Sequence, residues 1–217
     1  YEYDNIADEL SKSGINFFIG GGERYFNDRD DKRDIINEMV DYEFVNSIED
    51  YENTDSKNIG FFTAYDDPIE KYLGREPSLD NLIEVTLQKL KSFNKPFFLL
   101  IEGSQIDWAE HDNDPEYLLS EMLEFDAAIK SSYNFAEKNK NTLVVVTADH
   151  ETGGASIVDG NLEESITKTE YSSEKHTAEM VPVYSFGYNS SHFTGVYDNT
   201  EIFDKLKAII GKWKKYF

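Results

Sequence analysis

The sequence contains no cysteine, so disulfide bonds and thiolate chemistry are excluded and the redox compartment stays open. Basic residues are scarce, because 21 Lys and Arg stand against 43 Asp and Glu, for a formal net charge of -22. Nucleic acids and anionic membrane surfaces require a basic footprint, so the charge argues against both as partners. Long apolar runs are also missing: the longest, Phe97–Ile101, is far too short to span a bilayer.

Aromatic residues are plentiful, with 15 Phe and 14 Tyr, and 39% of the 217 residues are hydrophobic. This supply is enough for a sizeable core and argues against disorder. The chain opens on Tyr1 without a methionine and carries no recognisable signal peptide, so we expect a processed chain or a piece of a longer one.

Helical and strand patterns alternate along the chain. Apolar spacing predicts helices at residues 4–12, 32–40, 78–92, 114–138 and from 200 onwards, and strands at residues 15–19, 97–101, 142–147 and 181–186. This alternation predicts an α/β fold, with a largely parallel central sheet and helices on both faces, in a single domain over residues 1–217. Residues 23–77 and 155–175 are predicted to be loop or insert excursions around the sheet.

Side chains that can bind metal follow two of the predicted strands. Glu102, Asp107 and His111 come after residues 97–101, and Asp149 and His150 come directly after residues 142–147. In parallel sheets, ligands gather beyond the carboxyl ends of the strands. With His176 before the 181–186 strand, three of the four histidines stand near strands and carboxylates, which favours a metal site.

The residue types indicate which metals these positions suit. Asp107 and His111 are four residues apart, so one helical turn would point both the same way. A carboxylate plus imidazoles, with His176 completing the set, is typical of catalytic zinc with an open position. The oxygen ligand Glu102 suits magnesium better. Alternatively, Glu102 is a strand-end cap and Asp107 a turn residue.

Three segments also carry a family resemblance. EGSQIDWAEH (102–111), TADHETGG (147–154) and KHTAEMVPVYSFG (175–187), in this order, resemble the three C-terminal metal-binding motifs of alkaline phosphatases. GINFFIGGGERYF (14–26) resembles the strand and glycine turn that precede those motifs in the family. The resemblance covers most of the chain and implies an alkaline-phosphatase-like fold.

Residue by residue, the resemblance implies two zinc ions and one magnesium ion. The ligands it implies are Asp107, His111 and His176 for the first zinc, Asp149 and His150 for the second zinc, and Glu102 for the magnesium. Trp108 would shape the substrate pocket beside the phosphate, or else it is a packed aromatic residue.

The resemblance further implies a phosphomonoester hydrolase that works through a phosphoserine intermediate. Its ligands would be phosphate monoesters and inorganic phosphate, its location periplasmic or secreted, and a homodimer is one implied assembly. Metal cations would also explain how a chain of net charge -22 could bind a phosphate dianion.

The family's serine nucleophile, the aspartate before it and its phosphate-binding arginine all precede the glycine turn. The chain has one Asp-Ser pair, Asp55-Ser56, but it follows that turn and lies in a predicted loop. We therefore expect a fold that is incomplete at its N-terminal side, no catalytic serine in this chain, and no activity from the chain alone. The alternatives are a sulfatase, phosphodiesterase or phosphoglycerate mutase of the same superfamily, and a non-catalytic zinc-binding module.

Overall fold

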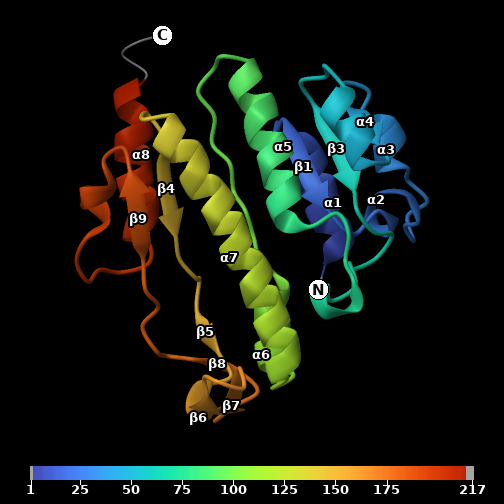
Figure 1. Ribbon diagram of the computed structural model, residues 1–217. Helices are drawn as coiled ribbons and strands as arrows, with labels where there is room; N and C mark the ends of the chain where they lie inside the picture. The colour runs from blue at the N-terminus through green and yellow to red at the C-terminus, as the bar shows by residue number, and fades with distance from the viewer. Residues whose placement is uncertain (1, 214–217) are drawn as a thin grey trace. The chain divides into compact units, whose positions relative to one another are not determined.

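The computed structural model describes residues 2–213 of the 217-residue chain (Figure 1). The chain divides into two compact units, an N-terminal unit (Tyr1–Phe97) and a C-terminal unit (Phe98–Phe217). That the two units together form the single domain expected over residues 1–217 stays a prediction. Within residues 2–213, no helix has the length and apolar character that crossing a bilayer requires.

The N-terminal unit is built on a three-stranded parallel sheet. Its strands are β1 (Phe17–Gly20), β3 (Ile59–Phe62) and β2 (Glu43–Val45), in the order β1-β3-β2. The helices of this unit are α1 (Tyr3–Lys12), α2 (Arg24–Asn27), α3 (Ile35–Glu38), α4 (Ile48–Asn53), the 3-10 turn η1 (Lys71–Leu73) and α5 (Leu79–Ser92). This parallel sheet with its helices confirms the predicted α/β class.

Helices pack on both faces of the parallel sheet, because successive strand side chains point to opposite faces. On one face, Ile59 and Phe61 of β3 pack with Tyr51 of α4 and Leu82 of α5. The other face packs α1, α2 and α3 against a second cluster that includes Phe18, Phe44 and Phe62. At Gly60 a Cβ would lie 2.5 Å from the Phe44 ring, so these aromatic rings require a glycine in the central strand.

Residues 23–77 differ from the expected excursion. They contain β2 and the central strand β3, together with α4, whose Tyr51 is fully buried. The strands are only three and four residues long and stand among many Asp, Glu and Asn residues. Periodicity alone does not distinguish such short apolar strands from loops when they stand among polar residues. The sequence pattern therefore predicted an excursion where the structure has two strands of the sheet.

The C-terminal unit combines two packed helices with three antiparallel strand pairs. The helices α6 (Gln105–His111) and α7 (Pro115–Lys138) come first along the chain, and η2 (Ser190–Phe193) and α8 (Glu201–Trp213) come last. The strand pairs are β4 (Leu143–Val146) with β9 (Tyr184–Gly187), β5 (Glu151–Thr152) with β8 (His176–Thr177), and β6 (Ser156–Asn161) with β7 (Ile166–Glu170). Among the residues that the structure describes, strands therefore pair in parallel only in the N-terminal unit.

The predicted strand at residues 97–101 joins no ladder among the described residues, so this prediction is wrong as to pairing. Phe98 is 64% exposed and Leu100 is 80% exposed, although both are large and apolar. A continuous apolar run indicates a buried strand, but it does not specify a partner.

Residues 155–175, the second predicted excursion, form the β6–β7 hairpin. Most of its side chains are exposed, and Leu162 is 99% exposed. The hairpin separates β5 from β8, so it lies between two motifs that contribute candidate ligands.

Candidate metal centre

Helix α6 presents the first two candidate ligands. Gln105 and Ala109 are buried on one side of this helix, and the Tyr117 hydroxyl of α7 donates to Gln105 Oε1 at 2.9 Å. Asp107 and His111 lie on another side, one turn apart, as the spacing predicted. The buried side therefore fixes the helix, and the partly exposed side carries the ligands.

Strand β8 brings the third candidate ligand, His176, to the same place. Gly153 and Gly154 follow β5 with φ values of +82° and +60°, and the turn lets residues 172–176 fold back. A Cβ at Gly153 would lie 2.9 Å from the Glu110 carbonyl oxygen, so the close approach of this turn to α6 also requires glycine. The β5–β8 ladder then pairs His176 with Thr152.

Glu151 fastens this turn rather than joining the ligand group. Its Oε1 accepts from the Gly154 amide at 2.8 Å, and its other oxygen accepts from the Thr177 hydroxyl.

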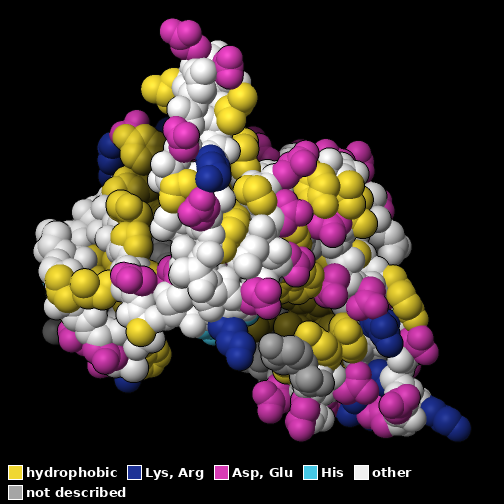
Figure 2. All heavy atoms as spheres, turned by 90° about the horizontal axis from the view of Figure 1, so that it is seen from below, with side chains coloured by type: hydrophobic (Ala, Val, Ile, Leu, Met, Phe, Trp, Pro, Cys, Tyr) yellow, Lys and Arg dark blue, Asp and Glu magenta, His cyan; other side chains and the backbone are white. Residues whose placement is uncertain are grey.

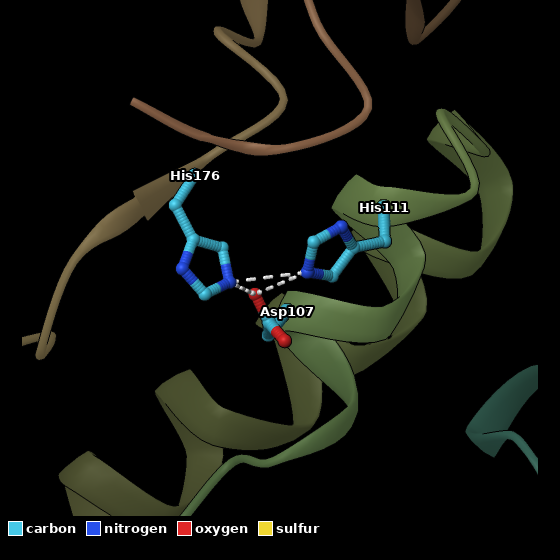
Figure 3. A group of neighbouring side chains, drawn as sticks. All are labelled: Asp107, His111 and His176. Carbon is cyan, nitrogen blue, oxygen red and sulfur yellow. Dashed lines mark hydrogen bonds and ion pairs between the residues drawn. The ribbon is translucent and has the colours of Figure 1, made fainter. Parts of the chain in front are cut away.

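Asp107, His111 and His176 converge on one point (Figure 3). Their ligand atoms all lie within 4.8 Å of one another, and no other such group of three occurs within residues 2–213. Asp107 Oδ1 is 3.5 Å from His111 Nε2 and 3.8 Å from His176 Nε2, and the two Nε2 atoms are 3.2 Å apart. Segments 65 residues apart in sequence thus supply one cluster.

The cluster fits zinc. His111 Nδ1 lies 2.7 Å from the Glu174 carbonyl oxygen, which can only accept, so Nδ1 carries the hydrogen and Nε2 is left with its lone pair. Tetrahedral zinc with Zn–N distances of about 2.0–2.1 Å places its nitrogen ligands roughly 3.3 Å apart. The observed 3.2 Å between the two Nε2 atoms matches that spacing.

The second predicted pair lies beside the first group. His150 Nε2 is 3.3 Å from Asp149 Oδ2, and the His150 ring stacks on His176 with centroids 3.6 Å apart. The side chain of Asp149 is 88% exposed. The structure therefore brings three histidines together, with one carboxylate for each candidate zinc.

Glu102 and Trp108 are not brought into the cluster. Glu102 is exposed in the irregular segment before α6, and it lies outside the converging group among the described residues. Trp108 is 39% exposed on α6, next to Asp107 in sequence. Their assignments to magnesium and to the substrate pocket stay predictions.

The sequence interpretation missed two residues of this region, Thr152 and Glu110. The Thr152 hydroxyl donates to Asp107 Oδ1 at 2.6 Å. Burial, together with the nearby carboxylates of Glu151 and Asp107, raises the pKa of Glu110 to about 7. A threonine two residues after His150 and a glutamate beside His111 were within the motifs, but only the fold shows what they face.

The raised pKa of Glu110 predicts a pH dependence of stability in the metal-free protein. Its folded-state pKa lies above the unfolded value, so stability falls as pH rises from about 4.5 through about 7. We expect Glu110→Gln to stabilise the EDTA-treated protein at pH 8, with a smaller gain at pH 5. Urea denaturation at both pH values measures the difference, and an equal gain at both would contradict it.

The chain as a whole is strongly acidic. Figure 2 shows Asp and Glu side chains spread over the face it presents, with fewer Lys and Arg, as the net charge of -22 requires. An anionic ligand would therefore depend on bound cations for its local attraction.

The parallel sheet and the carboxylate–imidazole cluster define an α/β protein with a candidate metal centre. A family model described as alkaline phosphatase matches residues 2–165. The chain belongs to the alkaline phosphatase family.

Relatives and solved structures agree with this assignment. The chain is 32% identical to alkaline phosphatase 3 of Bacillus subtilis (strain 168) in an alignment of 277 positions, gaps included, that covers 92% of this chain and 59% of the relative. It is 40% identical to alkaline phosphatase 4 of the same organism over 67% of this chain and 32% of the relative. The alkaline phosphatase of the Antarctic bacterium TAB5 superposes with a TM-score of 0.88 at 34% identity, over 95% of this chain and 63% of that chain.

The chain spans about three-fifths of alkaline phosphatase 3 and of the TAB5 protein. The activity of those longer proteins is therefore not assigned to this chain on similarity alone. A variant of the TAB5 protein is described with Mg bound in its M3 site, at 32% identity and a TM-score of 0.87. The family fold is thus established, whereas the activity and the metals of this chain are matters of proposal.

Proposed function

We propose that the chain supplies the C-terminal metal ligands of a metal-dependent phosphomonoester hydrolase that works through a phosphoserine intermediate. The observation that carries the proposal is the convergence of Asp107, His111 and His176 within 4.8 Å. The assignment of the chain to the alkaline phosphatase family supports the same reaction class.

The proposed centre holds two zinc ions and one magnesium ion. Asp107, His111 and His176 would hold the first zinc, Asp149 and His150 the second, and Glu102 the magnesium. When bound, paired metal ions of this kind stabilise the attacking and leaving oxygens of an in-line phosphoryl transfer.

The chain itself orients the proposed metal ligands. The Glu174 carbonyl fixes the His111 ring, and the β5–β8 ladder holds His176 opposite α6. Trp108 would line the pocket for phosphate monoesters and inorganic phosphate. We also propose a periplasmic or secreted location and a homodimer, both on the family resemblance.

A non-catalytic zinc-binding module is the second candidate. The specific observation in its favour is that one complete three-ligand group lies within the chain, whereas Asp149 of the second pair is 88% exposed. Binding of phosphate discriminates the two candidates, because only the hydrolase site needs it.

We expect the zinc-loaded chain to bind inorganic phosphate and the EDTA-treated chain to bind none. The physical reason is charge: a -22 chain attracts a phosphate dianion only where cations are held. Isothermal titration of inorganic phosphate into both forms measures the difference, with sodium sulfate at equal ionic strength as the control. Equal heats from the two forms would contradict the hydrolase proposal and favour the zinc-binding module.

A further inference from the structure

One buried hydroxyl lies between the two proposed zinc sites. Thr152 is 1% exposed, although its side chain is polar. Its Oγ1 is 2.6 Å from Asp107 Oδ1 of the first ligand set and 3.2 Å from His150 Nδ1 of the second. A buried hydroxyl with both partners in hydrogen-bond range links the two sets directly.

The direction of these two hydrogen bonds follows from the donor inventory. A carboxylate oxygen can only accept, so the single hydroxyl hydrogen of Thr152 goes to Asp107. The same hydroxyl can then only accept from His150, so Nδ1 of that ring carries its hydrogen. His150 Nε2 is left with a lone pair, 3.3 Å from Asp149 Oδ2.

The backbone fixes Thr152 in this place. Thr152 of β5 pairs with His176 of β8, so the partner strand in this ladder carries the third ligand of the first set. A β-branched side chain has few rotamers, and here the chosen rotamer aims the hydroxyl at Asp107.

We propose that Thr152 is a positioning residue that joins the two metal-ligand sets. Its hydroxyl holds the Asp107 carboxylate in place and selects the tautomer in which His150 offers Nε2 as a ligand. The inference rests on the proposed metal centre, because it concerns how that centre is prepared. Outer partners of this kind set the orientation and tautomer of metal ligands in other zinc sites.

The test compares Thr152→Val, which keeps the shape and removes the hydroxyl, with Thr152→Ser, which keeps the hydroxyl. Thr86→Val is the matched control: Thr86 is also buried, and its hydroxyl bonds only the Tyr51 hydroxyl, at 2.9 Å, in the N-terminal unit. Zinc affinity is measured by competition with a chromogenic chelator. We expect roughly 10- to 100-fold weaker zinc binding in Thr152→Val, and near wild-type binding in Thr152→Ser and Thr86→Val.

The outcomes separate this inference from the metal centre itself. No zinc binding by the wild-type chain overturns the metal centre and the inference together. Zinc binding that is equal in the wild type and Thr152→Val overturns the inference alone. If Thr152→Val does not fold, as circular dichroism would show, Thr152→Ala replaces it, and wild-type affinity in that variant is equally decisive.

A second readout does not depend on zinc. In the metal-free wild type at pH 9, nitrogen–proton correlation spectra of the histidine side chains, assigned with His150→Gln, should show the hydrogen of His150 on Nδ1. The same tautomer is expected in Thr152→Ser. A hydrogen on Nε2 in the wild type would overturn the proposed role of the hydroxyl.

Discussion

Replacing His176 with alanine is expected to weaken zinc binding more than any other single change discussed. Loss of an outer partner costs about 10–100-fold in affinity, and loss of a direct ligand should exceed that range. Asp107 and His111 would remain, but their two atoms do not complete a three-ligand site. We therefore expect an affinity loss of more than about 100-fold.

The same substitution should remove the stabilisation that zinc provides. At free zinc of about 100 times the wild-type Kd, binding stabilises the folded state by about 2.7 kcal/mol. For a chain of this size that corresponds to a rise in Tm of roughly 5–10 °C. The His176→Ala variant should show almost none of that rise, because its affinity is too low at the same zinc concentration.

Zinc content after gel filtration and Tm with and without zinc measure both effects. His192→Ala is the matched control, because His192 is exposed and its Nδ1 contacts only the neighbouring Asn189 carbonyl, at 3.1 Å. Unchanged zinc content and Tm in His176→Ala would show that the first-site assignment is wrong.

The converging site was predictable where local geometry decides it. The four-residue spacing of Asp107 and His111 places both on one side of any helix, and α6 is that helix. The arrival of His176 depends on a glycine turn and a two-residue ladder, neither of which has a periodic signal. The assignment of His176 to the ligand set therefore came from the family motif.

Other features were beyond the sequence because they depend on long-range packing. Thr152 reads as an ordinary strand residue until Asp107, 45 residues away, is placed beside its hydroxyl. The pKa of Glu110 depends on burial and on Glu151 across the turn, which a linear pattern does not show. Residues 97–101 carry a strand pattern, yet pairing requires a neighbour that periodicity cannot name.

The second large effect is an absence of turnover. We expect the 217-residue chain alone, with zinc and magnesium at pH 9, to hydrolyse a chromogenic phosphomonoester no faster than buffer. A phosphoserine reaction requires an activated serine beside the metal centre. The one Asp-Ser pair is Asp55-Ser56, and the Ser56 hydroxyl already donates to the Asn58 carbonyl at 3.0 Å.

This expectation is separable from zinc binding. The zinc-loaded wild type and the zinc-free His176→Ala variant should give the same background rate, whereas alkaline phosphatase 3 of Bacillus subtilis serves as the positive control for the assay. Turnover that requires zinc and disappears in His176→Ala would keep the metal centre and refute the claim that this chain lacks a nucleophile. Acid trapping of a phosphorylated serine would then identify that nucleophile, because phosphoserine survives acid that strips the metals. Binding of zinc and phosphate without turnover is instead the pattern expected of a metal centre that has no activated serine beside it.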